Sequence, residues 1–116
     1  NLGLLLTNFK KFEEAEKHFK KAIELNPNFY QAFNNLGVSQ KENKNFDKAM
    51  ESFDKALEIE PSFAKAHNNI ALIHLFRGNI ELSIKFFENA VKYNTGIVRA
   101  LNMIARIYLT KLLTKM

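Results

Sequence analysis

The sequence contains no cysteine, which excludes a disulfide framework, a cysteine-based zinc site and a cysteine nucleophile. It also contains no glycine-rich phosphate loop, no cluster of metal-ligand residues and no Ser/His/Asp grouping with supporting context. We therefore expect no enzyme activity, no cofactor and no small-molecule substrate. No apolar run approaches the roughly twenty residues of a membrane-spanning helix, so we expect no membrane insertion either.

Proline and glycine are scarce, with two and four residues, and both prolines lie at one repeated spacing. Hydrophobic residues make up 47% of the chain and charged residues 25%, a composition typical of a globular protein and not of a disordered one. No segment alternates between apolar and polar residues, so no strand is predicted. The expected fold class is therefore all-α.

The chain repeats itself at a fixed interval. Asn34-Asn35-Leu36-Gly37 returns as Asn68-Asn69-Ile70-Ala71, and Pro27 returns as Pro61. The same interval separates the members of two further series, Phe19, Phe53 and Phe87, and Ala22, Ala56 and Ala90. A fixed period of this length indicates a repeat array.

Asparagine, glycine and proline divide each repeat into two helices. Helices are predicted over 1–8, 12–25, 29–42, 46–59, 63–76, 80–93 and about 97–112. The predicted N-caps are Asn28, Asn45, Ser62 and Asn79. Within each repeat, the helix that comes earlier in the chain is called the first helix and the one that follows it the second helix.

Small residues recur where paired helices would cross, with aromatic and aliphatic residues around them. On the first helices these are Gly37, Ala71 and Ala105, and on the second helices Ala15, Ala49 and Ser83. A small side chain at the crossing lets two helix axes approach closely. One pair cannot bury such a surface alone, but stacked pairs can, which predicts a solenoid.

The pattern resembles the tetratricopeptide repeat. The residues that carry the resemblance in the best-matched repeat are Phe33, Leu36, Gly37, Ala49, Phe53, Ala56 and Pro61. The resemblance implies a right-handed superhelical solenoid of about seven helices, with residues 1–116 as a single domain. That domain divides into a partial first repeat (1–28), a second (29–62), a third (63–96), and residues 97–116 as the first helix of a fourth repeat or a capping helix.

The chain departs from the family pattern at four positions: Gln40, His67, His74 and Thr95. We expect these residues to weaken the packing between the third repeat and the helix that follows it, without preventing the chain from folding. Because the chain begins with Asn1 within a repeat, we expect it to be a fragment, from which a targeting segment could be missing. With no signal-peptide pattern present, a cytoplasmic location is expected.

In this family the first helices line a concave groove. The residues expected to face it are Asn34, Asn35, Val38, Lys65, Asn68, Asn69, Leu72, Phe76, Arg99, Asn102 and Arg106. An asparagine amide both donates and accepts, so it can clamp the backbone of an extended peptide. Asn35 and Asn69 resemble the asparagine ladder of O-linked N-acetylglucosamine transferase repeats. The alternative is that these amides bond only to neighbouring turns. For Leu75, packing is as good an explanation as groove lining.

The surplus positive charge lies on the first helices. The chain has 17 basic and 12 acidic residues, and six of the basic and one of the acidic residues lie on the first helices. The rest of the chain has equal numbers of basic and acidic residues. A basic groove attracts an acidic partner, although the same surplus could serve solubility alone. The leading hypothesis is therefore a protein-interaction scaffold that binds an extended, possibly acidic, peptide segment.

Two alternatives remain. Self-association is one, because the last helix is apolar over residues 101–113. RNA binding is the other and is less favoured, since it rests only on the sequence pI of about 9.5.

Overall fold

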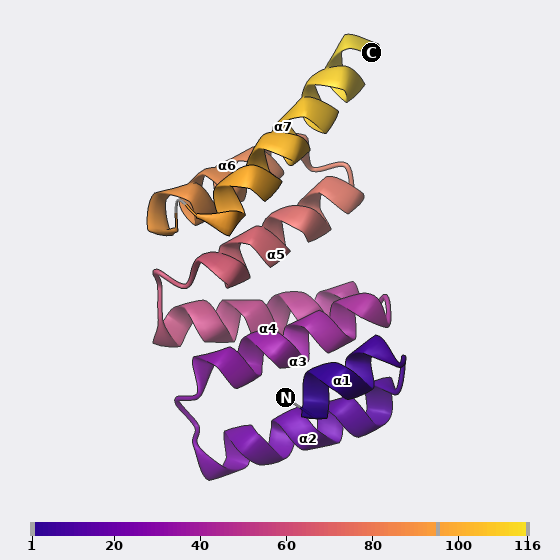
Figure 1. Cartoon of the computed structure of the whole chain (residues 1–116), viewed down its shortest axis with the longest axis vertical. Helices are drawn as coiled ribbons and strands as arrows, with labels where there is room; N and C mark the ends of the chain where they lie inside the picture. Colours follow the sequence, from indigo (N-terminus) through magenta and orange to yellow (C-terminus); the bar gives the residue numbers. More distant parts are fainter. Residues whose placement is uncertain (1, 95, 116) are drawn as a thin grey trace. The chain divides into compact units, whose positions relative to one another are not determined.

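The computed structural model of the chain describes residues 2–94 and 96–115, and within the last helix it describes side chains from residue 105 on. The described residues form seven helices and no strand (Figure 1). They are α1 (Leu2–Asn8), α2 (Phe12–Leu25), α3 (Tyr30–Glu42), α4 (Phe46–Ile59), α5 (Ala64–Phe76), α6 (Ile80–Tyr93) and α7 (Ile97–Lys115). None of these described helices is long and apolar enough to cross a membrane.

The second helices α2, α4 and α6 have the bounds that the sequence predicts. The first helices α3 and α5 each begin one residue later than predicted, and α7 continues to Lys115 instead of ending near Leu112. The extension of α7 follows from its sequence, because no Gly, Asn or Pro follows Leu112 to end the helix.

Two of the four predicted N-cap positions are wrong and two are confirmed. Asn28 and Ser62 do not occupy N-cap positions, which fall on Phe29 and Phe63. The backbone N–H of Asn28 instead donates to Oδ1 of Asn26 at 3.2 Å, in a turn that shifts the helix start by one residue. Asn45 and Asn79 do stand at N-caps, but neither side chain makes a cap hydrogen bond.

The first helices α1, α3 and α5 each end in the same turn, which contains one residue with a left-handed backbone. That residue is Lys10, Lys44 or Gly78, with φ of 60°, 63° and 81°. In the second repeat the N–H of Lys44 donates to the carbonyl of Lys41, and the N–H of Asn45 to that of Gln40. These are the two bonds of a Schellman motif, which satisfies carbonyls at a helix end.

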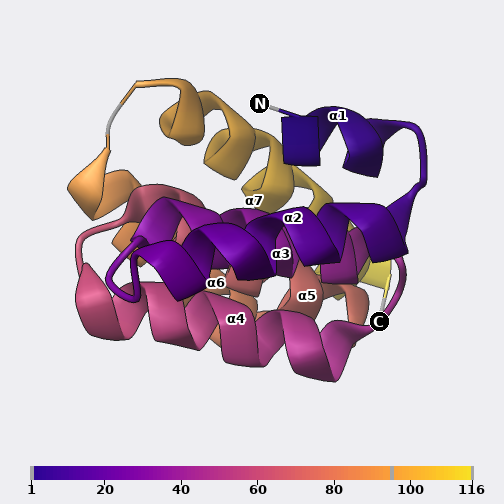
Figure 2. The same ribbon diagram turned by 90° about the horizontal axis from the view of Figure 1, so that it is seen from below.

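The chain falls into two compact units, residues 1–61 and residues 62–116. In unit 1, α1 packs on α2 and α3, and α3 packs on both α2 and α4. Figure 2 shows the short α1 beside one end of α2. Their core contains Ala15, Phe19 and Leu36, with Leu4, Leu6 and Ile23 packed against it.

Glycine is required where α3 crosses α4. A Cβ atom at Gly37 would lie 2.5 Å from Cε1 of Phe53, whose side chain is fully buried. Gly3 stands in the same relation to Phe19, where an added Cβ would overlap the ring. The space beside the glycines of α1 and α3 is therefore in each case filled by a phenylalanine of the second helix that follows in the chain.

In unit 2 the position that corresponds to Gly37 is an alanine, Ala71. Ala71 of α5, Phe87 of α6 and Ala105 of α7 form one buried cluster, with Leu75 and Phe86 packed against it. For Leu75 the packing interpretation therefore holds. In this unit α6 packs on α5 and α7, and α7 also touches α5.

Three of the four departures from the family pattern have compensating partners. Gln40 is buried, and its Oε1 accepts a 2.6 Å hydrogen bond from Oγ of Ser52. In unit 2 the corresponding pair, His74 and Phe86, stacks ring on ring at 5.6 Å. The buried His67 ring stacks on Tyr93 at 5.4 Å. The fourth departure, Thr95, lies outside the described residues.

Candidate functional site

In unit 1 one face of α3 carries a row of four residues that are exposed or half-buried. They stand at i, i+4, i+7 and i+11, the spacing that keeps residues on one helix face. These residues, the unit 1 stripe, are Gln31, Asn35, Val38 and Glu42. Gln31 and Glu42 are exposed, and Asn35 and Val38 are half-buried.

In unit 2 the same four positions of α5 form the unit 2 stripe. Its members are Lys65, Asn69, Leu72 and Phe76. Lys65 is exposed and Asn69 half-buried, whereas Leu72 is 37% and Phe76 72% exposed. Leu72 and Phe76, both expected from the sequence to face the groove, thus form an exposed apolar patch on this helix.

Adjacent asparagines of α3 and α5 lie on different sides of these helices: Asn34 and Asn68 lie on one side, and Asn35 and Asn69 on another. Asn34 is only 4% exposed, so the prediction that it faces an open groove is wrong. Its counterpart in α5, Asn68, is half-buried, and its Oδ1 is buried with no hydrogen-bond partner. The reason is helix geometry: Asn34 and Asn35 are adjacent, so their side chains point about 100° apart. Only Asn35 and Asn69 belong to the stripes.

Two of the three predicted site residues in α7, Arg99 and Asn102, have side chains outside the described residues. The third, Arg106, is exposed, and its Nη2 lies 3.4 Å from Oε1 of Glu88 in α6. An ion pair this exposed stabilises the fold by less than about 1 kcal/mol. It nevertheless offsets part of the positive charge expected at that position.

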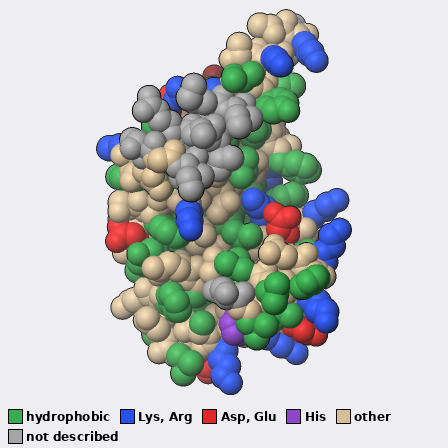
Figure 3. All heavy atoms as spheres, viewed as in Figure 1, with side chains coloured by type: hydrophobic (Ala, Val, Ile, Leu, Met, Phe, Trp, Pro, Cys, Tyr) green, Lys and Arg blue, Asp and Glu red, His purple; other side chains and the backbone are tan. Residues whose placement is uncertain are grey.

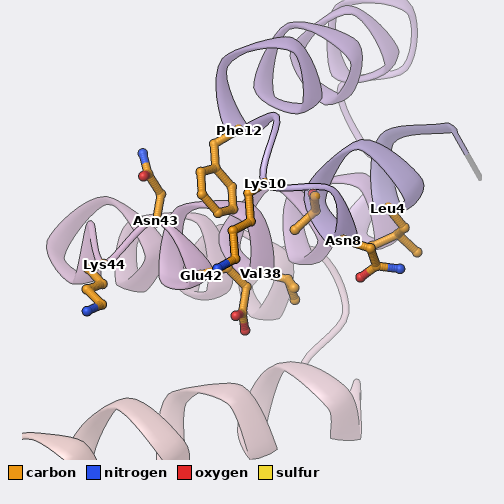
Figure 4. A pocket seen from close by; sticks show the side chains of 9 residues that line it. Leu4, Asn8, Lys10, Phe12, Val38, Glu42, Asn43 and Lys44 are labelled. Atoms are coloured by element: carbon orange, nitrogen blue, oxygen red, sulfur yellow. The ribbon is translucent and has the colours of Figure 1, made fainter.

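A pocket of about 450 Å³ adjoins the unit 1 stripe (Figure 4). Leu4 and Asn8 of α1 lie on one side of the pocket, and Lys44 lies on the other side. Val38 and Glu42 of α3 lie in the middle. Its remaining lining residues are Thr7, Lys10, Phe12 and Asn43. Of these residues the sequence predicted only Val38 as a site residue. The repeat interval could have pointed to Leu4 and Asn8, which precede Val38 and Glu42 by one repeat.

Lys41 of α3 is a basic residue beside the unit 1 stripe, and only 18% of its side chain is accessible. Burial lowers the pKa of Lys41 from its usual 10.5, and the nearby Glu42 carboxylate opposes this by raising it. The Nζ of Lys41 and Oε1 of Glu42 lie 4.0 Å apart. Lys41 therefore contributes less to the open surface than its position in the sequence indicates.

Among the described residues, no three His, Cys, Asp or Glu side chains are grouped so that they could hold a metal ion. His67 and His74 both face the aromatic rings of α6. They therefore act in packing between α5 and α6.

Paired antiparallel helices that recur at a fixed interval define a helical repeat protein. Models of the tetratricopeptide repeat match residues 1–29, 30–63 and 64–96. The chain belongs to the tetratricopeptide repeat family, and its fold class is the all-α solenoid that this family builds from helix pairs.

No curated protein matches the chain. A solved structure that does is described as the crystal structure of MamA, with 26% sequence identity and a TM-score of 0.74. The match covers 81% of this chain and 55% of the MamA chain, so this chain spans about half the length of that relative. Tetratricopeptide repeats generally mediate protein–protein interaction, and the family is typically a non-catalytic scaffold.

Proposed function

We propose that this chain is a non-catalytic scaffold that binds extended, acidic segments of partner proteins at the unit 1 stripe and at the unit 2 stripe, each stripe being a binding surface of its own unit. One observation carries the proposal. The same stripe positions recur in both units, with an asparagine at the second place and an apolar residue at the third. A surface that only had to be soluble would not need this repeated order.

Asn35 and Asn69 are suited to hold a peptide backbone. Each is half-buried, which fixes the stem of the side chain by packing. An amide offers a donor and an acceptor, which match the carbonyl and N–H of one peptide unit. Such contacts hold any extended segment and are indifferent to its side chains, so specificity has to come from elsewhere.

The apolar members of the stripes supply part of that specificity. Val38 lines the 450 Å³ pocket together with Leu4 and Phe12, which gives room for one aliphatic or aromatic side chain. Leu72 and Phe76 offer an open apolar surface in unit 2. Buried apolar anchors dominate the affinity of most protein interfaces.

Basic residues favour an acidic segment. Lys10 and Lys44 line the pocket in unit 1 against Glu42, and Lys65 is exposed in the unit 2 stripe. Positive charge around a binding surface speeds capture of an acidic ligand and weakens with salt. The preferred ligand is thus an extended segment with one or two apolar anchors flanked by Asp or Glu.

A random peptide library selected on the immobilised chain tests this proposal. The selected peptides are then measured on the wild type and on the double variant Asn35→Ala/Asn69→Ala. We expect acidic sequences with an apolar anchor, and a loss of about tenfold in affinity for the double variant, since two amide contacts of about 0.5–1.5 kcal/mol each are removed.

The matched control is Asn89→Ala, an equally half-buried asparagine on the second helix α6. This variant should keep the affinity of the wild type. Circular dichroism and the midpoint of urea unfolding check that all three proteins are folded. The proposal fails if no sequence is enriched, or if the double variant binds the selected peptides as tightly as the control does.

A further inference from the structure

The unit 2 stripe has a cation at one end of α5 and an apolar surface at the other. Lys65 stands in the first turn of the helix, and Phe76 is its last residue. Leu72 and Phe76 stand four residues apart, so their side chains are neighbours on one helix face. Apolar side chains are visible at several places on the surface in Figure 3, and a single one needs no explanation. An adjacent pair that shares its face with a cation is a more specific arrangement.

The stability of α5 does not explain this arrangement. The N-terminal end of a helix carries a partial positive charge, so a lysine in the first turn is unfavourable and an acidic residue there is favourable. The first turn of α5 nevertheless contains Lys65 and no acidic residue. Phe76 buries little of its side chain, since 72% of it is exposed. Binding of a ligand therefore explains both residues better than folding does.

The stripe positions stay open in helices that have further helices after them in the chain. Four more helices follow α3, yet Val38 is half-buried and Glu42 is exposed. In unit 2, α6 and α7 both pack on α5, and Leu72 is still 37% exposed. The opening along α5 is therefore a property of a first helix inside the repeat array.

The stripe runs along the axis of α5, so sequence spacing converts to distance. From Lys65, Leu72 stands at i+7 and Phe76 at i+11, which is about 10 Å and about 16 Å along the axis at 1.5 Å per residue. An extended peptide advances about 3.3 Å per residue. A segment that lies along α5 with a carboxylate at Lys65 therefore brings a side chain about three to five positions away over the apolar patch.

We infer that the unit 2 stripe recognises a linear motif in an extended segment: an acidic residue with a bulky apolar residue about three to five positions away. Lys65 pairs with the carboxylate, while Leu72 and Phe76 cover the apolar side chain. Asn69 stands between them and holds the backbone of the segment. The inference rests on the proposed function, to which it adds the spacing of the motif and the unit that binds it.

The unit 1 stripe is not suited to this motif. Gln31 and Glu42 stand at its two ends, so it has no cation at the first place and a carboxylate at the last. The basic residues of unit 1 lie instead at the pocket, as Lys10 and Lys44. The two units therefore prefer different acidic segments, and the motif belongs to unit 2.

Fluorescein-labelled peptides of Ser, Thr and Gln that carry one Glu and one Phe are suitable probes. The Phe stands directly beside the Glu, about four positions away or about ten positions away, in both orders. A second series has Lys in place of Glu. Affinity for the whole chain is measured by fluorescence anisotropy. The protein variants are Lys65→Glu and Leu72→Ser/Phe76→Ser, with Lys85→Glu as the control, which makes the same change in net charge at an exposed lysine of α6.

We expect the Glu peptide with the spacing of about four, in one order or both, to bind at least about tenfold more tightly than the other spacings, because it alone places both side chains at once. Lys65→Glu should reverse the charge preference, so that the Lys peptide of this spacing binds more tightly than the Glu peptide. Leu72→Ser/Phe76→Ser should lose about tenfold or more in affinity, and Lys85→Glu should bind as the wild type does. Because Lys65→Glu puts an acidic residue in the first turn, this variant should be at least as stable in urea as the wild type.

Three results overturn the inference. They are equal affinity for the three spacings, a charge preference that Lys65→Glu leaves unchanged, and binding that persists undiminished in Leu72→Ser/Phe76→Ser. Failure of the proposed function looks different, because then the random library yields no enriched sequence at all. Enriched library peptides together with no binding of the probes would overturn the motif alone.

Discussion

The substitution Gly37→Ala separates packing from helix propensity at the crossing of α3 and α4. Alanine is the better helix former, and on propensity alone the change would stabilise the chain by about 1 kcal/mol. The structure predicts the opposite. The new Cβ would meet three ring carbons of Phe53 at 2.5, 2.7 and 2.9 Å, well inside ordinary contact.

Phe53 cannot move aside at little cost, because its side chain is completely buried. Overpacking of this kind costs about 1–3 kcal/mol, which exceeds the gain in propensity. We therefore expect a net loss of about 1 kcal/mol in the free energy of unfolding, or roughly 4 °C in melting temperature for a chain of this size. Urea unfolding followed by far-ultraviolet circular dichroism measures the difference.

The reciprocal change in unit 2 is the control. Ala71→Gly removes a Cβ that packs against Phe87, and should also destabilise the chain by about 1 kcal/mol or more. If propensity governed both sites, the two substitutions would have opposite signs. A Gly37→Ala protein about 1 kcal/mol more stable than the wild type would refute the packing of Phe53 on Gly37.

Three further predictions concern the turns, a buried hydrogen bond and a buried cation. Gly78→Ala should destabilise the chain by about 1 kcal/mol in urea unfolding and Lys44→Gly should not, because both positions have a left-handed backbone that glycine adopts at least cost. Ser52→Ala should cost about 1–3 kcal/mol, since Oε1 of the buried Gln40 loses its donor, and the double variant Ser52→Ala/Gln40→Leu should recover much of it. Because burial lowers the pKa of Lys41 in the folded state, the folded chain binds fewer protons there than the unfolded chain as pH approaches 10.5. The wild type should therefore gain stability relative to Lys41→Met as the pH is raised through that range, and a difference that stays constant with pH would contradict the burial of its ammonium group.

The architecture was predictable because it rests on a period. The intervals between Phe19, Phe53 and Phe87 and between the small residues opposite them are sufficient to define pairs of helices that cross at a notch. The repeat interval also placed the second helices correctly to the residue. The capping preferences of single residues predicted the helix starts less well. Asn28 and Ser62 are good capping residues, yet the helices begin after Phe29 and Phe63 without any side-chain cap.

The site was harder to predict, because a one-residue difference turns a side chain by about 100°. Asn34 and Asn35 look alike in the sequence, but packing buries the first and leaves the second partly open. Pairs such as Gln40 with Ser52 also escaped prediction. Each looks like a departure from the family pattern until its partner on the next helix is placed beside it.

The most direct test of peptide binding by the two stripes is to map where an extended acidic peptide binds. Two-dimensional nuclear magnetic resonance of the isotope-labelled chain, titrated with a peptide from the library selection, reports the site residue by residue. We expect amide shifts to change around the unit 1 stripe and the unit 2 stripe, with Asn35 and Asn69 among the most affected. Changes confined to the second helices α2, α4 and α6 would contradict it.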